Sequence, residues 1–246
     1  MPAGVIVLVL AVLLGASVAQ TVAGFGFALI AMPFLITVLD VKDAIVVVSV
    51  GAFLNSTLVA RATWDDIPRG PVARMLLAAF VGMPLGLAVL LLAPEDTLRI
   101  IVAVSSIAMA LALVAGLRFG GSDRVGEAVA GGISGVLSTS TGMNGPPIVL
   151  FLQDRGYARD AFRGALSSFF FGTGIVSFAL LALSGVVDRS AMLLGLASVP
   201  AVLLGNAGGA RLAGRLQPAV FRLLVLGLLV LTSLVALGVT VGRIVA

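Results

Sequence analysis

Two residue types on which many enzymes depend are missing from this chain. Its 246 residues include no cysteine and no histidine. Without cysteine there is no disulfide, thiolate metal ligand or thiol nucleophile. Without histidine the chain lacks the commonest general base and the commonest transition-metal ligand. The sequence also has no Walker A motif, dinucleotide fingerprint or cluster of metal ligands. We therefore expect no enzyme activity, no cofactor and no metal.

Charge is scarce as well. Only 11% of the residues are charged and 60% are hydrophobic, and the mean hydropathy is +1.22, whereas a soluble domain has about 25% charged residues. Such a chain cannot cover its surface in water, so we expect the lipid bilayer to be its solvent. The sequence pI near 11.0 could suggest nucleic acid. However, the arginines stand in short gaps between apolar runs, as in membrane proteins, so we expect no nucleic-acid partner.

The apolar runs predict transmembrane helices. They do not alternate polar and apolar residues as the strands of a membrane barrel would, so an all-α polytopic fold is expected. Residues 1–23 lack the basic start of a signal peptide and are predicted to be a retained segment. The runs cover Ala3–Leu39, Ala44–Ala60, Pro71–Ala93, Leu98–Leu117, Ala128–Leu152, Ala161–Leu183, Ala191–Ala210 and Ala219–Val241.

Two of these runs are predicted to be broken hairpins. Ala3–Leu39 is far longer than the roughly 20 residues that one crossing needs, and its middle reads Gly24-Phe25-Gly26-Phe27. Ala128–Leu152 is interrupted by the polar residues 138–141 and then by Gly142-Met143-Asn144-Gly145-Pro146-Pro147. Glycine and proline weaken or break a helix. We expect two short arms around an irregular tip in each run.

The two hairpins occupy matching places in an internal repeat of roughly 120 residues. Each is followed by a charged linker and a helix that opens with Asp-Ala, at Asp43 and at Asp160. Proline and glycine also recur at similar places, in Gly82–Gly86 and in Pro200 with Gly205. The predicted first repeat, 1–120, has hairpin 3–39 and helices 44–60, 71–93 and 98–117. The second, 121–246, has hairpin 128–152 and helices 161–183, 191–210 and 219–241, in one membrane domain.

Basic residues predict the topology. Eight simple crossings would divide the 15 lysines and arginines almost evenly between the two sides. If both long runs return to the side they entered, eleven of the 15 fall on one side, as the positive-inside rule requires. Each half is then a hairpin plus three crossings, so the halves are inverted repeats with both termini outside.

The tip sequences resemble those of a known family. Gly24-Phe25-Gly26-Phe27 with the later Pro33, and Gly142-Met143-Asn144-Gly145-Pro146-Pro147 with the apolar residues 148–152, are similar to the TauE/SafE sulfite exporters. The resemblance extends over nearly the whole chain and implies export of small sulfur-containing anions, such as sulfite or organosulfonates, across the bacterial inner membrane. Asn144 stands where the family often has glycine, so the substrate preference is left open.

The tips are the predicted substrate site. A broken helix leaves backbone N–H groups free, its N-terminus is partly positive, and a small anion needs such donors. In hydrocarbon, such a break is tolerated where it lines a polar cavity. A structural kink is the alternative for the tips, and polar contacts between helices are the alternative for the amides. The predicted substrate-binding residues are Gln20, Thr21, Gly24, Phe25, Gly26, Asn55, Thr139, Ser140, Thr141, Gly142, Met143, Asn144, Gly145, Pro146 and Asn206.

Three further features have both a functional and a structural interpretation. Arg163 could reach the first tip or could anchor its helix at the cytoplasmic side. Asp43 and Asp160 are interpreted mainly as helix N-caps rather than proton carriers. The pairs Gly82 with Gly86, Gly131 with Gly135, and Gly205 with Gly209 have the small-xxx-small spacing of close helix contacts.

The sequence thus predicts a secondary transporter of a small anion that works by alternating access around two midplane tips. Without an ATPase motif, the driving force would be an ion gradient or the gradient of the anion itself. An anion channel and a non-transporting membrane subunit are the alternatives, and paired polar breaks favour transport over a mere anchor. The substrate, the direction of transport, the coupling ion and the formation of a homo-oligomer are left open.

Overall fold

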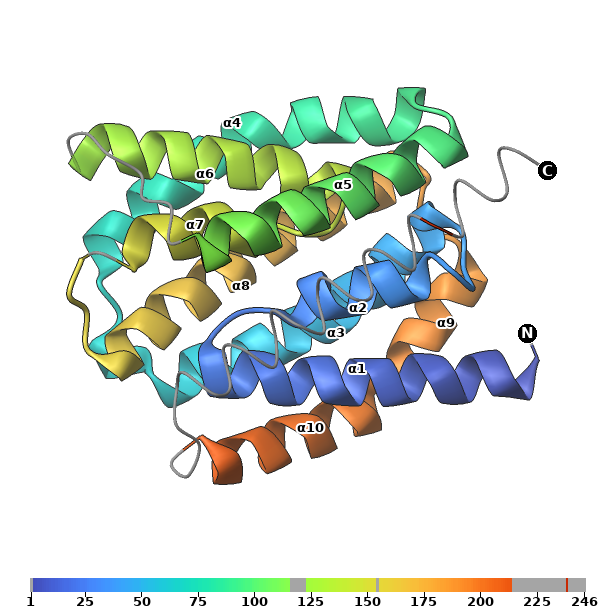
Figure 1. Cartoon of the computed structure of the whole chain (residues 1–246), viewed down its shortest axis with the longest axis horizontal. Coiled ribbons are helices and arrows are strands. Elements are labelled where there is room, and N and C mark those ends of the chain that lie inside the picture. Colours follow the sequence, from blue (N-terminus) through green and yellow to red (C-terminus); the bar gives the residue numbers. More distant parts are fainter. Residues whose placement is uncertain (1, 116–122, 154, 214–237, 239–246) are drawn as a thin grey trace.

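The computed structural model describes residues 2–115, 123–153, 155–213 and 238, and every regular element in them is a helix (Figure 1). The predicted last helix, Ala219–Val241, lies almost wholly outside this part. The helices are α1 (Ala3–Ala23), α2 (Phe27–Leu35), α3 (Val41–Ala62), the 3-10 helix η1 (Trp64–Asp66), α4 (Arg69–Leu92), α5 (Glu95–Val114), α6 (Asp123–Ser140), α7 (Gly145–Leu152), α8 (Arg159–Leu183), α9 (Arg189–Ala197) and α10 (Val199–Leu212).

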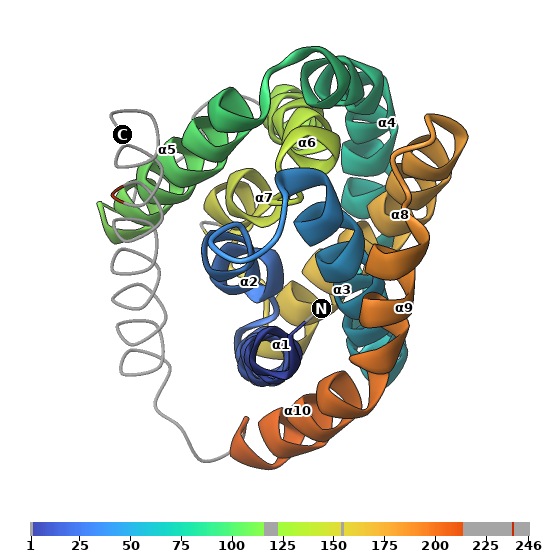
Figure 2. The same ribbon diagram turned by 90° about the vertical axis from the view of Figure 1, so that its right-hand side faces the viewer.

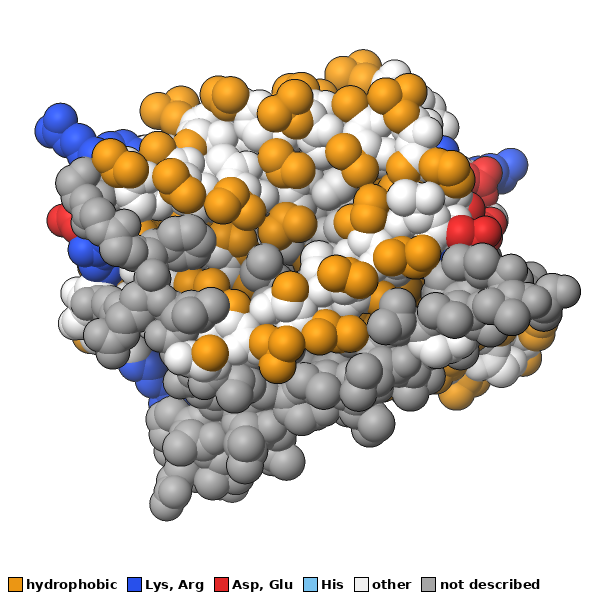
Figure 3. Space-filling view, turned by 45° about the horizontal axis from the view of Figure 1, so that its top comes forward, with side chains coloured by type: hydrophobic (Ala, Val, Ile, Leu, Met, Phe, Trp, Pro, Cys, Tyr) orange, Lys and Arg blue, Asp and Glu red, His pale blue; other side chains and the backbone are white. Residues whose placement is uncertain are grey.

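The helices confirm a membrane protein. Among the described residues, five spans are long and apolar enough to cross a bilayer: α1, α3, α4, α8 and the continuous stretch of α9 and α10. Large apolar side chains such as Leu77, Val81 and Leu85 of α4 are more than half exposed. Figure 3 shows hydrophobic side chains across the middle of one face, with charged side chains gathered toward its ends. This distribution suits an outer surface that contacts lipid.

Both long runs break where the sequence predicts. Between α1 and α2, Gly24 and Gly26 have φ angles of +87° and +106°, and Gly142 between α6 and α7 has +73°. These left-handed conformations suit glycine, which has no Cβ to clash. The Gly24 N–H donates to the Gln20 carbonyl at 2.7 Å and closes α1. The prediction of two tips formed by irregular backbone is confirmed.

The two hairpins enter the bundle from opposite ends. α1 begins and α2 ends at one end, whereas α6 begins and α7 ends at the other (Figure 1). The short second arms lie inside the bundle: all of α7 and most of α2 are buried. Figure 2 shows both arms enclosed by longer helices. Each tip therefore lies within the protein rather than at its surface.

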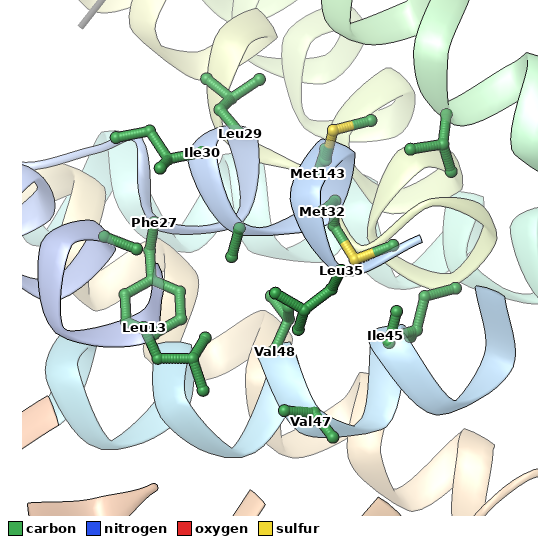
Figure 4. Close-up of a cluster of buried hydrophobic side chains, with 14 of the residues drawn as sticks. Leu13, Phe27, Leu29, Ile30, Met32, Leu35, Ile45, Val47, Val48 and Met143 are labelled. Carbon is green, nitrogen blue, oxygen red and sulfur yellow. The ribbon is translucent and has the colours of Figure 1, made fainter. Parts of the chain in front are cut away.

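Apolar packing holds the first hairpin's second arm in place. Phe27, Met32 and Leu35 of α2 are at most 2% exposed. Figure 4 shows them beside Val48 of α3, with Met143 of the second tip also in this cluster. In a bilayer such packing stabilises the arm through van der Waals contacts rather than through removal of apolar area from water. The buried cluster thus includes residues of both tips.

The paired glycines form close helix contacts, as predicted. α6 packs on α4, and a Cβ added at Gly135 would lie only 2.0 Å from the Ala79 carbonyl oxygen. A Cβ at Gly86 would lie 2.0 Å from the Val136 oxygen. α10 packs on α1 in the same way, and a Cβ at Gly205 would lie 2.4 Å from the Leu14 oxygen. Each hairpin's first arm is therefore in backbone contact with a helix of the other half of the chain.

The predicted span Ala191–Ala210 is confirmed as part of one continuous stretch, Arg189–Leu212, in which a turn at Ser198 separates α9 from α10. Ser198 donates its N–H to the Leu194 carbonyl at 3.1 Å and to the Gly195 carbonyl at 3.2 Å. Pro200 has no N–H and occupies the first turn of α10, a position where a helix tolerates proline.

Candidate functional site: a cavity between the two hairpin tips

The two tips meet at one cavity with about 580 Å³ of empty space, its opening included. Residues of both tips line it, together with one face of α3 and one face of α8. The lining residues are Gln20, Gly26, Phe27, Ala28, Leu29, Val48, Ser49, Ala52, Phe53, Ser56, Ser138, Gly142, Met143, Asn144, Gly145, Phe170, Gly174 and Ser177.

The first tip contributes backbone donors. α2 begins directly after Gly26, and this N-cap residue makes no side-chain capping bond. The N–H groups of the first helical turn have no carbonyl acceptor within the helix. These N–H groups belong to Phe27, Ala28 and Leu29, all of which line the cavity. The partly positive N-terminus of α2 therefore lies at the cavity wall.

The second tip contributes side-chain donors instead. α7 begins at Gly145, and its next two residues, Pro146 and Pro147, have no N–H. The sequence argument for free backbone donors at this tip is therefore wrong for two of the three first-turn positions. The side-chain amide of Asn144, a lining residue, donates to the Thr173 hydroxyl at 2.9 Å. A weaker contact joins the same amide to the Ser138 hydroxyl at 3.5 Å.

Two buried polar atoms on residues of the cavity wall have no protein partner. Gln20 is 1% exposed and donates through Nε2 to the Ser56 hydroxyl at 2.8 Å, but its Oε1 has no hydrogen bond. The Ser177 hydroxyl of α8, in a residue 4% exposed, is also unpartnered. Buried polar groups are nearly always hydrogen-bonded. The Ser177 hydroxyl can therefore donate to a bound molecule, whereas the Gln20 Oε1 can only accept a hydrogen bond from one.

Asn55 and Asn206 lie beside the cavity rather than in its lining. The Asn206 amide donates to the Asn55 Oδ1 at 2.9 Å and to the Thr21 hydroxyl at 3.0 Å. The Ser17 hydroxyl also donates to the Asn55 Oδ1, at 2.9 Å. These side chains form one polar cluster between α1, α3 and α10. This arrangement is that of polar contacts between helices, and a direct role in binding remains a prediction.

The polar run before the second tip is used mainly for local backbone contacts. The Thr139 hydroxyl donates to the Met83 carbonyl, and those of Ser140 and Thr141 donate to carbonyls one turn back, all at 2.7–2.9 Å. None of the three lines the cavity, nor do Gly24, Phe25 and Pro146 at the tips. The predicted site residues in the lining are Gln20, Gly26, Gly142, Met143, Asn144 and Gly145.

Sequence reasoning left out the walls contributed by α3 and α8. Ser49 and Ser56 stand seven residues apart on α3, and Phe170, Gly174 and Ser177 follow helical spacing on α8. Residues three, four and seven apart share one helix face. A search for small and polar residues with this spacing would have found both walls.

Arg163 contacts the first tip from outside the cavity. Its Nη2 donates to the Thr21 carbonyl at the end of α1 at 2.7 Å, and its Nη1 donates to Asp160 at 3.0 Å. Its side chain is 14% exposed and packs against Gly24. A cation at the negative end of α1 is electrostatically favourable. Arg163 therefore holds the tip's backbone and does not present its charge to the cavity.

The predicted capping roles of two aspartates need correction. Asp43 and Asp160 stand in the first turns of α3 and α8, but the N-caps of these helices are Asp40 and Ala158, and neither cap makes a side-chain bond. An acidic residue in the first turn still interacts favourably with the helix dipole. For Asp160, which also accepts a hydrogen bond from Arg163 at 3.0 Å, the role is therefore electrostatic rather than that of a hydrogen-bonded cap.

Comparison with known proteins agrees with this geometry. The sequence model of one family, described as "Sulfite exporter TauE/SafE", matches residues 8–236. No curated protein and no solved structure matches the chain. Because the match covers most of the sequence and includes both tips, the chain belongs to the TauE/SafE sulfite exporter family.

Proposed function

We propose that the chain is a secondary transporter that exports a small anion, sulfite or an organosulfonate, and binds it in the cavity between the tips. The observation that carries the proposal is the meeting of two helix N-termini, at Phe27 and at Gly145, on one cavity wall. Two partly positive helix ends and neutral donors favour an anion. Within the described chain, no aspartate or glutamate lines this cavity to oppose it.

Alternating access is the mechanism that this architecture supports best. The hairpins enter from opposite ends (Figure 1), and the contacts of α6 with α4 and of α1 with α10 are counterparts under the proposed repeat. This reciprocity supports two inverted repeats, residues 1–120 and 121–246. Inverted repeats with broken helices around a midplane site are a common transporter design. Opening the cavity alternately to each side would then move the anion across the membrane.

The distribution of basic residues supports an orientation in the bacterial inner membrane. α3 ends where α4, α6 and α8 begin and where α10 ends (Figure 1). Arginines in or beside these helix ends gather there, and the positive-inside rule makes this end cytoplasmic. Among the described residues, the opposite end has fewer basic side chains, namely Lys42, Arg99 and Arg189. The arginines of the proposed cytoplasmic end are Arg61, Arg69, Arg74, Arg124, Arg155, Arg159, Arg163 and Arg211.

Substitution of Asn144 tests the proposed site. The change Asn144→Ala removes one amide donor from the wall, and losing a hydrogen bond to a charged ligand costs about 1.5–3 kcal/mol, or about ten- to a hundredfold in affinity. Asn144→Asp should weaken binding further, because it places a negative charge against the anion. Calorimetry with sulfite and methanesulfonate on the purified chain measures both effects, and efflux from proteoliposomes measures transport.

The matched control is Gln153→Ala, which removes an exposed amide just after α7. It should leave binding unchanged. If both Asn144 variants keep the normal dissociation constant and remain folded, the second tip is only a kink. Asn55 and Asn206 would then be the next residues to test.

A further inference from the structure

The cavity lining is polar but carries no full charge. None of the described residues that line it is an arginine, lysine, aspartate or glutamate. Arg163, which touches the first tip, is already bound to Asp160 and to the Thr21 carbonyl. Arg155, near the end of α7, is paired with Asp123 and lies over the Phe151 ring. The described part of the chain therefore offers a bound anion dipoles and hydrogen bonds, but no countercharge.

A lining of this kind discriminates between anions by their charge. The cost of removing an ion from water grows with the square of its charge, by the Born relation. The attraction of fixed dipoles and neutral donors grows only in proportion to the charge. A second negative charge therefore raises the desolvation cost by more than it strengthens the attraction to these dipoles and donors. Without a paired cation, a doubly charged ligand is strongly disfavoured in such a site.

The lining also has apolar area that a fully hydrated oxyanion would not use. Phe27 from α2, Phe53 from α3 and Phe170 from α8 contribute aromatic rings from three different helices. Leu29 and Val48 add aliphatic surface. Small-molecule sites commonly combine such walls with a few polar groups that fix the ligand's orientation. An anion with one charged head and a small apolar substituent matches this combination.

From these observations, and resting on the proposed function, we propose that the cavity binds its sulfur oxyanion in the singly charged form. The ligand class is hydrogen sulfite or a small alkanesulfonate, with the charged head at the hydroxyls of Ser56 and Ser177 and the amide of Asn144. Doubly charged sulfite and sulfate are excluded. The unpartnered hydroxyl of Ser177, a residue 4% exposed, indicates independently of the helix ends that this cavity has an unused donor for an anion.

The test measures affinity against pH for ligands whose charge responds differently to pH. Sulfite passes from the singly to the doubly charged form across the neutral range, whereas methanesulfonate stays singly charged and sulfate stays doubly charged. None of the described lining side chains titrates in this range. Calorimetry on the full chain in detergent, from mildly acidic to mildly alkaline pH, therefore reports the charge of the ligand.

We expect the methanesulfonate affinity to stay constant with pH. The apparent sulfite affinity should fall about tenfold per pH unit once the doubly charged form dominates, because only the remaining fraction can bind. Sulfate should bind too weakly to measure. A sulfite affinity that holds or rises with pH, or a sulfate affinity comparable to that for methanesulfonate, overturns the inference but leaves anion binding intact. Failure of all these oxyanions to bind refutes the proposed function and this inference with it.

A variant that adds a cation gives a second readout. Ser49 is a partly exposed residue of the lining, so a longer side chain can be placed there with limited burial. Ser49→Lys should bring sulfate into the measurable range and flatten the pH dependence of sulfite binding. The matched control, Ser49→Gln, adds bulk without charge and should keep the preference for singly charged ligands. If Ser49→Lys is folded and still rejects sulfate, lack of countercharge is not the cause of the selectivity.

Discussion

Substituting alanine for glycine on α6 tests the close contact between this helix and α4. Gly135 and Gly132 stand three residues apart on the same helix. A Cβ at Gly135 would lie 2.0 Å from the Ala79 oxygen and 2.7 Å from the Ala79 Cα. A Cβ at Gly132 would have its nearest neighbour, the Ala78 oxygen, at 3.9 Å. The same substitution is therefore forbidden by backbone at one position and unhindered at the other.

The two variants should differ by several kcal/mol. In a helix interior, replacing glycine by alanine contributes about 0.5–1 kcal/mol of stability, so Gly132→Ala should be neutral or slightly stabilising. At Gly135 the helices would have to separate by roughly 1.5 Å to restore an ordinary contact. Overpacking typically costs about 1–3 kcal/mol, and here no flexible side chain can yield. We expect Gly135→Ala to lose about 2–3 kcal/mol, equivalent to a melting temperature about 5–10 °C lower.

Thermal unfolding of the purified variants in one detergent measures this difference. Gly205→Ala and Gly208→Ala repeat the comparison on α10, because a Cβ at Gly205 meets the Leu14 oxygen at 2.4 Å and one at Gly208 meets nothing within 4 Å. Equal melting temperatures within each pair would show that the helices are not in backbone contact, and the packing argument would fail.

Two further predictions concern the first hairpin. Arg163→Ala should cost about 1.5–3 kcal/mol of stability, since it removes a charged donor from the Thr21 carbonyl. Asp160→Ala, at a residue whose side chain is 58% exposed, should cost less. If thermal unfolding shows the reverse order, Arg163 does not hold the backbone of the first tip. Because the chain has no native cysteine, single cysteines can report topology. Asp40→Cys should react with an impermeant thiol reagent from outside and Asp65→Cys from the cytoplasm. Labelling of Asp40→Cys only from the cytoplasm would exclude the proposed first hairpin.

Local backbone chemistry made the two tips predictable. Gly24, Gly26 and Gly142 interrupt apolar runs, and all three adopt positive φ angles, which suit glycine. Proline is a weaker guide, because Pro84 lies inside the intact α4 whereas Pro200 marks the start of α10. Neighbouring helices decide whether a proline is accommodated inside a helix or marks the start of one, and the sequence around each proline does not contain that information.

The identity of the cavity residues could be predicted only in part. Asn55 and Ser56 are neighbours on α3, yet Ser56 lines the cavity and Asn55 joins the polar cluster beside it. Successive residues of a helix point about 100° apart, so the position of the partner helices decides which one faces the substrate. The amide of Asn55 offers more hydrogen bonds than the Ser56 hydroxyl, so the sequence favoured Asn55 as a substrate contact, whereas Ser56 is the neighbour that lines the cavity.

The interleaved glycine contacts also constrain the order in which the chain can complete its fold during synthesis. α1 is made first, but the helix against which its backbone packs is α10, and the Ser17 hydroxyl bonds to the Val202 carbonyl 185 residues later. Contacts of such large sequence separation form late, and the segments that wait for them are exposed to misassembly. The first hairpin therefore stays in the membrane without its contact to α10 until nearly all of the second half has been inserted.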